Sequence, residues 1–123
     1  MTIKKEEVVS LGIVLKTHPY KESDSLVTVY FKDYGKMTLI ARGVKKLKSK
    51  NASACQSLTL SEFTFIPRNG LSTMIKASSV DFYRYIKENL ELEAYASYFM
   101  EFVLKNEEDN QPDLEIFDTL KNH

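Results

Sequence analysis

The fold is decided by the stretch SLVTVYFKDYGKMTLIA (residues 25–41), which has the pattern of two strands with a turn between them. Apolar residues recur at every second position on both sides of KDYG, and this period of two is typical of strands with one buried face. A glycine-containing turn between two such runs predicts a β-hairpin. The side chains expected on its buried face are Val27, Val29, Phe31, Met37, Leu39 and Ala41.

Three further strands are expected around this hairpin. Residues 9–15 alternate in the same way, and THPYKESD (17–24) is a polar connection that leads into the hairpin. SLTLSEFTFIP (57–67) and LSTMIKASSV (71–80) follow, with the tight-turn signal RNG between them. Five strands in the first 80 residues predict a small antiparallel barrel, closed or nearly closed, because closure removes exposed strand edges. A five-stranded OB-like barrel fits this strand count, and a small sandwich is the alternative.

The period changes after residue 86. Leu92, Ala96, Phe99 and Val103 follow the spacing of an amphipathic helix, and a second helix is expected through LEIFDTLKN, with Asp113 either capping or beginning it. Two helices of this size cannot form a core of their own, so their apolar face must lie against the barrel, another copy or further sequence. We therefore expect a mainly β protein with a barrel domain over residues 1–82 and the incomplete start of an α-helical domain over residues 83–123.

The charges divide between these two parts, although the formal net charge of the chain is zero. Residues 1–80 contain 13 Lys and Arg against 6 Asp and Glu, whereas residues 81–123 contain 4 against 11. Such asymmetry indicates a part that faces a polyanion, joined to an acidic part.

Cations are concentrated in ARGVKKLKSKN (41–51), directly after the hairpin. A strand that buries Met37 and Leu39 turns Lys36 and Arg42 outward, and Lys16 and Lys76 on other strands would extend the same patch. One interpretation is a surface that binds backbone phosphates by releasing counterions, with Tyr30 and Tyr34 as candidates for stacking on bases. The other is a solvated loop that serves only solubility. The candidate phosphate-binding residues are Lys36, Arg42, Lys45, Lys46, Lys48 and Lys50.

The residues needed for catalysis or metal binding do not occur in a recognisable pattern. GVKKLKS (43–49) lacks the second glycine of a phosphate loop. Cys55 is expected to be a small buried hydrophobe, and a single cysteine with two distant histidines offers no zinc site. We predict no catalytic residue, no metal and no cofactor. No apolar run reaches the roughly 18 residues of a membrane span, and no secretory signal is visible, so we expect a cytoplasmic protein without membrane contact.

The segment GIVLKTHPYKESDSLVTVYFKDYGKMTLIARGVKKLKSK (12–50) resembles the opening of the bacterial RecO family of recombinational repair proteins. The family pattern is a strand G-x-V-L, a connection Y-x-E-x-D/S-x-L-V-T, a glycine turn, and then A-R-G with a basic segment that ends in serine. Weaker similarity continues through LTLSEFTF, EAYASYFMEFVLK and PDLEIFDTL.

The resemblance implies an N-terminal OB-fold, a helical domain that continues beyond this length, and DNA binding on the basic OB surface. As matches to the family's basic segment, the implied DNA-binding residues are Lys36, Arg42, Lys45, Lys46, Lys48 and Lys50. It also implies annealing of complementary strands, and work with RecR to load RecA onto strands covered by single-strand-binding protein at the nucleoid. We therefore predict a recombinational repair mediator that binds single- and double-stranded DNA. The alternatives are a protein-interaction module that binds repair partners without significant DNA affinity, and a fragment without a function of its own.

Overall fold

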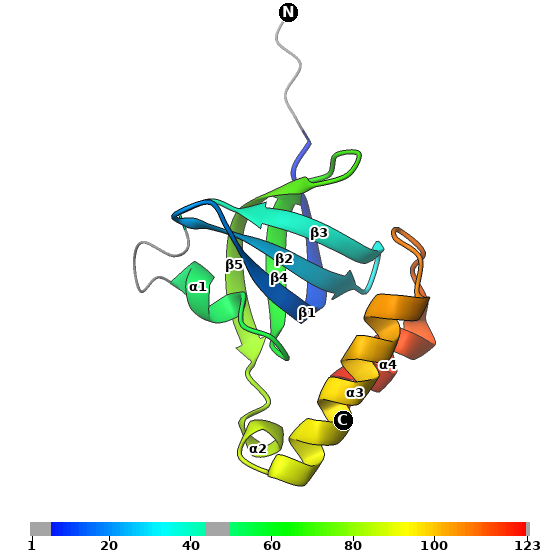
Figure 1. The fold of residues 1–123 in the computed structure, drawn as a ribbon. Helices are drawn as coiled ribbons and strands as arrows, with labels where there is room; N and C mark the ends of the chain where they lie inside the picture. The colour runs from blue at the N-terminus through cyan, green and yellow to red at the C-terminus, as the bar shows by residue number, and fades with distance from the viewer. Residues whose placement is uncertain (1–5, 44–49, 123) are drawn as a thin grey trace, which may run out of the picture.

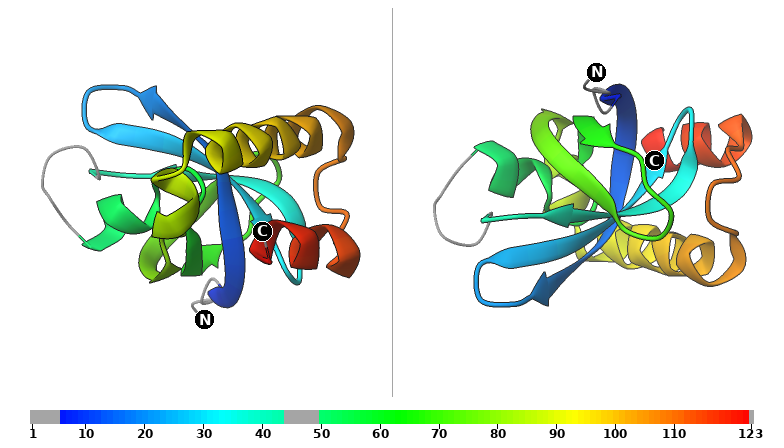
Figure 2. Two further views of the ribbon diagram at one scale, coloured as in Figure 1. Left: turned by 90° about the horizontal axis from the view of Figure 1, so that it is seen from below. Right: turned by 90° about the horizontal axis from the view of Figure 1, so that it is seen from above.

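The computed structural model describes residues 6–43 and 50–122, which form a five-stranded barrel with α3 and α4 packed against it (Figure 1). The strands are β1 (Val8–Tyr20), β2 (Asp24–Phe31), β3 (Gly35–Ala41), β4 (Leu60–Ile66) and β5 (Ser72–Asp81). The helices are α1 (Lys50–Ala54), α2 (Arg84–Lys87), α3 (Leu90–Asn106) and α4 (Leu114–Lys121). In both views of Figure 2, α1 lies on the side of the barrel away from α4.

The barrel closes in the order β1-β2-β3-β5-β4, with α1 in the connection from β3 to β4. Four neighbouring pairs are antiparallel, and the short β3–β5 pair is parallel. A closed ring with an odd number of strands cannot alternate in direction throughout, so the expectation of a wholly antiparallel barrel is wrong at this pair. The predicted five-stranded OB-fold barrel is confirmed, and the alternative of a sandwich is wrong.

β1 extends further than its composition indicated. The residues THPY, interpreted as part of a polar connection, continue β1 to Tyr20 and pair with β2, with Pro19 opposite Ser25. The pairing of β1 with β4 ends at Ile13, so this part of β1 pairs only with β2. A proline, which has no N–H to donate, is tolerated on such an edge. The pairing partner, rather than the local sequence, therefore sets the length of this strand.

Aromatic rings fill much of the barrel interior. The six side chains predicted to face inward from the hairpin are all buried, none more than 7% exposed. Phe31 stacks on Phe65 with 4.6 Å between ring centroids and lies edge-on to Phe63 at 5.5 Å. Because burying one large apolar side chain contributes about 1.5–3 kcal/mol, this aromatic cluster is a major source of the barrel's stability.

Two small residues lie where the interior has little room. A Cβ on Gly12 would lie 2.8 Å from Phe31 Cδ1 and would also meet Val29, so a side chain at this position of β1 would displace the core. Cys55 is 3% exposed, with its Sγ 3.6 Å from Met74 Sδ. Burial raises the pKa of Cys55 to about 12, so the thiol remains protonated near neutral pH. The prediction of a small buried hydrophobe is confirmed.

A second apolar cluster joins α3 and α4 to the outside of the barrel. Ile13 and Tyr30 project outward from β1 and β2, yet both are 0% exposed because the helices cover them. The predicted amphipathic helix is confirmed as α3, which buries Ala96 and Val103 in this cluster and leaves Leu92 36% exposed. The helical segment therefore uses the barrel surface to complete its own core.

Both longer helices begin at a side-chain cap. Asn89 Oδ1 accepts two hydrogen bonds of 3.1 Å from first-turn N–H groups of α3. Asp113 Oδ1 does the same for α4 at 2.9 and 3.3 Å, as predicted.

β5 ends at Asp81 and α2 begins at Arg84, on either side of the boundary expected between two domains. The division into domains itself stays a prediction.

Candidate nucleic-acid interface

The outward side chains of β1, β2 and β3 form a surface that we call the outer β1–β3 face, and Figure 1 shows its three strands side by side. The hydroxyl oxygens of Thr28 and Thr38 lie 3.2 Å apart across β2 and β3. Lys16 and His18 are exposed, and the other members are half-buried. Cross-strand pairing arranges the face in two rows, which are Lys16, Thr28 and Thr38, and then His18, Leu26 and Ile40.

A groove of about 340 Å³ separates this face from the C-terminal half of α3. Its barrel wall supplies the ammonium groups of two lysines and the hydroxyl groups of two threonines, all of them hydrogen-bond donors. Its helical wall includes Lys105, which forms an ion pair with Glu101 at 3.3 Å. Most of the hydrogen-bond donors of the groove therefore lie on its barrel side. The lining residues are Lys16, Thr28, Lys36, Thr38, Glu101, Leu104, Lys105 and Asp109.

Lys36 is on the outside of the barrel, as predicted, but α3 covers it. Its Nζ donates a 2.8 Å hydrogen bond to the carbonyl oxygen of Leu104 and lies 3.8 Å from Asp109 Oδ1, and its side chain is 13% exposed. Leu104 is in the last turn of α3, where free carbonyl groups attract cations. Lys36 thus caps the C-terminus of α3. The sequence contained no sign of this contact, because the partners are 68 positions apart.

The α3–α4 connection is fixed to the β2–β3 turn around Lys36. The N–H of Asn110 donates to the carbonyl oxygen of Lys36 at 3.0 Å. Gly35 has a φ of 72°, and a Cβ there would lie 2.6 Å from the backbone of Gln111. The carbonyl of Gln111 also accepts a 3.3 Å hydrogen bond from the hydroxyl of Tyr30. These contacts hold one wall of the groove in place.

Arg42 is exposed directly after β3. It lies beside the β1–β2 turn, because Asp24 Oδ1 accepts a 2.8 Å hydrogen bond from the N–H of Gly43. Lys21 in that turn is also exposed, with its Nζ 5.3 Å from the ring centroid of Tyr20. Exposed cations therefore lie at the end of the outer β1–β3 face that is remote from the Lys36 joint.

The other predicted cations are not placed by the structure. Lys45, Lys46 and Lys48 lie outside the described residues. Lys50 is the first residue of α1, and its side chain is outside the described part of the chain. Of the six candidate residues, the structure thus gives side-chain surroundings for Lys36 and Arg42 alone, and it does not bring these two together.

The two tyrosines proposed for base stacking differ in position. Tyr30 is fully buried beneath the helices, so its assignment as a stacking residue is wrong. Burial, with the nearby carboxylates Glu107 and Asp113 adding to it, raises the pKa of Tyr30 above its ordinary value. Tyr34 is half-buried at the end of the barrel. His18, which lies in the segment interpreted as a polar connection, is exposed on β1.

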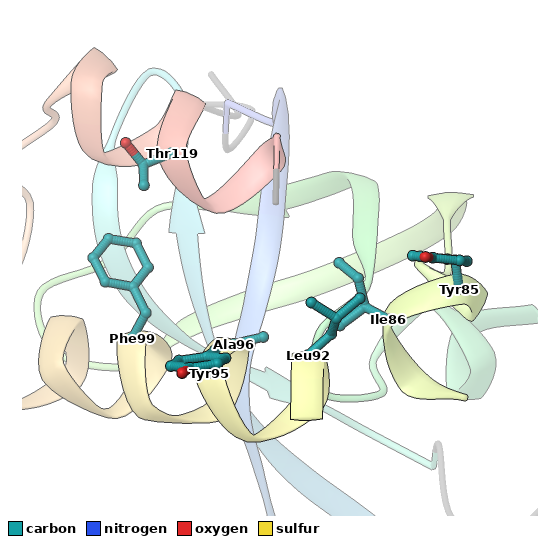
Figure 3. Close-up of a pocket in the computed structure, with 7 residues that line it drawn as sticks. All are labelled: Tyr85, Ile86, Leu92, Tyr95, Ala96, Phe99 and Thr119. Atoms are coloured by element: carbon teal, nitrogen blue, oxygen red, sulfur yellow. The ribbon is translucent and has the colours of Figure 1, made fainter. Parts of the chain in front are cut away.

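A second hollow, of about 300 Å³, lies among the helices (Figure 3). In Figure 3, Phe99 rises from α3 towards Thr119 of α4, while Tyr85 lies on α2 beyond Ile86. Tyr85 is 77% exposed and Tyr95 is 70% exposed. Exposed aromatic rings around an apolar hollow are typical of protein-binding surfaces. The lining residues are Tyr85, Ile86, Leu92, Tyr95, Ala96, Phe99 and Thr119.

Within residues 6–43 and 50–122, none of the helices combines the length and the apolar character needed to cross a bilayer. The same residues contain no group of three or more His, Cys, Asp or Glu side chains placed to hold a metal ion.

The closed barrel and its polar outer β1–β3 face place the chain in the class of OB-fold proteins, which use the face of strands 2 and 3 to bind oligonucleotides or oligosaccharides. The family described as "Recombination protein O N terminal" matches residues 5–83. A Listeria monocytogenes relative named DNA repair protein RecO is 38% identical over 101 residues, which cover 82% of this chain and 40% of the relative. A relative of the same name from Bacillus cytotoxicus is 35% identical over 109 residues, covering 89% of this chain and 44% of the relative. The chain belongs to the RecO family and spans less than half the length of these relatives.

Proposed function

We propose that the chain acts in recombinational DNA repair by binding single- and double-stranded DNA, annealing complementary strands and helping to load a recombinase. The single observation that carries this proposal is the row of Lys16, Thr28 and Thr38 across three strands of an OB barrel, on the same outer face that leads to Arg42. Family membership supports it, because the relatives are named DNA repair proteins.

Phosphate neutralisation is the proposed mechanism. Lysine and arginine side chains that contact a strand release its condensed counterions, and this attraction is independent of sequence. We assign the phosphate contacts to Lys16 and Lys21 in addition to the exposed Arg42, and retain Lys45, Lys46, Lys48 and Lys50 as members of the predicted basic segment. Lys36 is assigned to the joint with α3, because Leu104 and Asp109 already engage its ammonium group. No covalent chemistry is required, since annealing needs only charge neutralisation and proximity of two strands.

Two measurements test the proposal, namely single-strand binding and strand annealing across a range of salt concentrations. If about five phosphates are neutralised, log affinity falls with log salt at a slope of about −3.5. Lys16→Ala with Arg42→Ala should reduce that slope by about 1.4 and slow annealing. Arg84→Ala with Lys121→Ala removes the same charge from the helical segment and should leave both measurements unchanged. Binding that does not depend on salt contradicts the mechanism.

Protein binding is the second candidate function, and the exposed tyrosines around the helical hollow favour it. The proposed partner is RecR, with single-strand-binding protein and RecA as further members of the same pathway. In this case Tyr85→Ala with Tyr95→Ala should weaken the complex with RecR while DNA binding is retained. A stable RecR complex, together with no detectable DNA affinity at low salt, would make protein binding the primary function.

A further inference from the structure

A third hollow, of about 610 Å³, lies at one end of the barrel and outside the groove described above. Three segments that are distant in the sequence meet there, namely the β2–β3 turn with the start of β3, the β4–β5 turn and the α3–α4 connection. The hollow is wide and open to solvent, and its lining is mainly polar. The lining residues are Tyr34, Met37, Pro67, Arg68, Asn69 and Asn110.

The turn that carries Arg68 is held in one conformation by its neighbours. The N–H of Arg68 donates a 3.0 Å hydrogen bond to Ser72 Oγ, and its Nε donates to Thr73 Oγ1 at 3.3 Å. Gly70 supplies the positive φ of 81° that the turn requires. One guanidinium nitrogen is therefore bonded to β5, while the side chain is exposed and accessible to an anion.

The other two segments are equally well fixed. The Tyr34 ring lies edge-on to Phe31 and Phe65, with 6.4 and 5.6 Å between ring centroids. Asn110 adopts a left-handed conformation with φ 59°, and its N–H is bonded to the carbonyl of Lys36. The ring of Tyr34, in the β2–β3 turn, and the side-chain amide of Asn110, in the α3–α4 connection, thus both border the hollow.

The chemistry of these groups fits a nucleotide. An aromatic ring stacks on a base irrespective of its sequence, and a guanidinium group binds phosphate. The side-chain amides of Asn69 and Asn110 each offer donors and an acceptor, which match the edge of an unpaired base. The six lining residues include no carboxylate, and Arg68 is the one charged residue among them.

The hollow is also close to the groove at the outer β1–β3 face. Met37 lines the hollow and Lys36 lines the groove, so consecutive residues of β3 contribute to the two sites. Asp109 and Asn110 are divided in the same way on the α3–α4 connection. A strand bound in the groove therefore has a second site within reach around this connection.

We propose that this hollow binds one unstacked nucleotide of a single strand, with its phosphate on Arg68, its base against Tyr34 and its base edge at Asn69 and Asn110. The inference rests on the proposed DNA-binding function and adds a base-binding site to a surface that otherwise contacts the backbone. Its consequence is a difference between single and double strands, because a paired and stacked base cannot enter the hollow.

The direct test titrates the chain with thymidine monophosphate and follows the side-chain amide signals of Asn69 and Asn110 by NMR. Both signals should shift, and Arg68→Ala should reduce the shift at least tenfold. Arg84→Ala, which removes one exposed cation at the other end of the molecule, should leave the shift unchanged. Shifts that are absent, or that persist in Arg68→Ala, overturn the inference.

The second test measures binding of a twelve-nucleotide oligothymidylate and of a duplex of the same length. Arg68→Ala and Tyr34→Leu should each weaken binding of the single strand about tenfold and leave duplex binding unaltered. Tyr34→Phe keeps the ring and should bind normally. If Tyr34→Leu does not fold, Arg68→Ala alone decides, since its side chain is exposed. If Arg68→Ala binds the single strand as tightly as the unaltered chain does, the proposed nucleotide site is wrong, whereas the proposed DNA-binding function is not affected. No oligonucleotide binding by the unaltered chain at low salt overturns the proposed function itself.

Discussion

The barrel and the helical segment bury their apolar side chains in opposite ways. In the barrel, Phe31, Phe63 and Phe65 are all 0% exposed, and the ring of strands leaves no open side. On α3, Val103 is 1% exposed whereas Tyr98 is 76% exposed. One helix thus completes a core on the barrel and also presents aromatic rings to its surroundings.

This difference gives the two regions exposed surfaces of different chemistry. A closed barrel with its apolar side chains inside is free to present lysine and threonine side chains on its outer face, as β1, β2 and β3 do. The helical segment is acidic, and it exposes several large side chains, among them Leu90, Tyr95 and Tyr98. A polyanion is attracted to the first surface and repelled by the second, whereas a protein partner gains most from covering the second.

The largest expected effect contrasts a phenylalanine of each region. Phe31→Ala removes a ring from the centre of the barrel and should cost about 3–5 kcal/mol of unfolding free energy, because the cavity cannot close around the remaining rings. Phe102→Ala removes a ring that is 52% exposed on α3 and should change stability by less than about 0.5 kcal/mol. Urea unfolding of both variants measures the difference. Similar losses in the two would mean that the helical segment is as tightly packed as the barrel.

The sequence predicted the barrel well, because the hairpin at residues 25–41 buries one face and its period of two is therefore undisturbed. It failed where a second layer covers the first. Tyr30 and Lys36 follow the strand pattern and point out of the barrel, but α3 and its neighbours cover both. Periodicity specifies which way a side chain points and contains no information on what is packed above it. For this reason the sequence could place Arg42 on the surface, where the structure has it, but could not show that α3 covers Lys36.

The second prediction concerns the contact that joins the two regions. Lys36→Met removes the ammonium group that caps Leu104 and should lower the unfolding free energy by about 1.5–3 kcal/mol, since a charged hydrogen bond to a backbone carbonyl is lost. The amide of Asn110, bonded to the Lys36 carbonyl, should exchange faster with solvent as the connection loosens.

Lys105→Met is the matched control for this joint. It removes one lysine from the wall of the same groove, but its ion pair with Glu101 is exposed, so the expected loss is below about 0.5 kcal/mol. Equal losses in the two variants would mean that Lys36 does not hold the regions together. The salt dependence of DNA binding adds an independent check. Lys36→Met should leave the slope of log affinity against log salt unchanged, whereas Lys16→Ala should reduce it. A smaller slope in Lys36→Met would return this lysine to the set of phosphate contacts.

The smallest effect belongs to the end of the helical segment. Asp113→Ala removes the cap of α4 and should cost about 1 kcal/mol, whereas Asp118→Ala on the exposed side of the same helix should cost much less. The consequence should be local, because α4 has eight residues and contributes Phe117 and Leu120 to the cluster over Tyr30. Hydrogen exchange should therefore rise across α4 while the amides of the barrel strands keep their protection. A uniform loss of protection in all strands would contradict a local effect. It would mean that the stability of the barrel depends on the packing of α4.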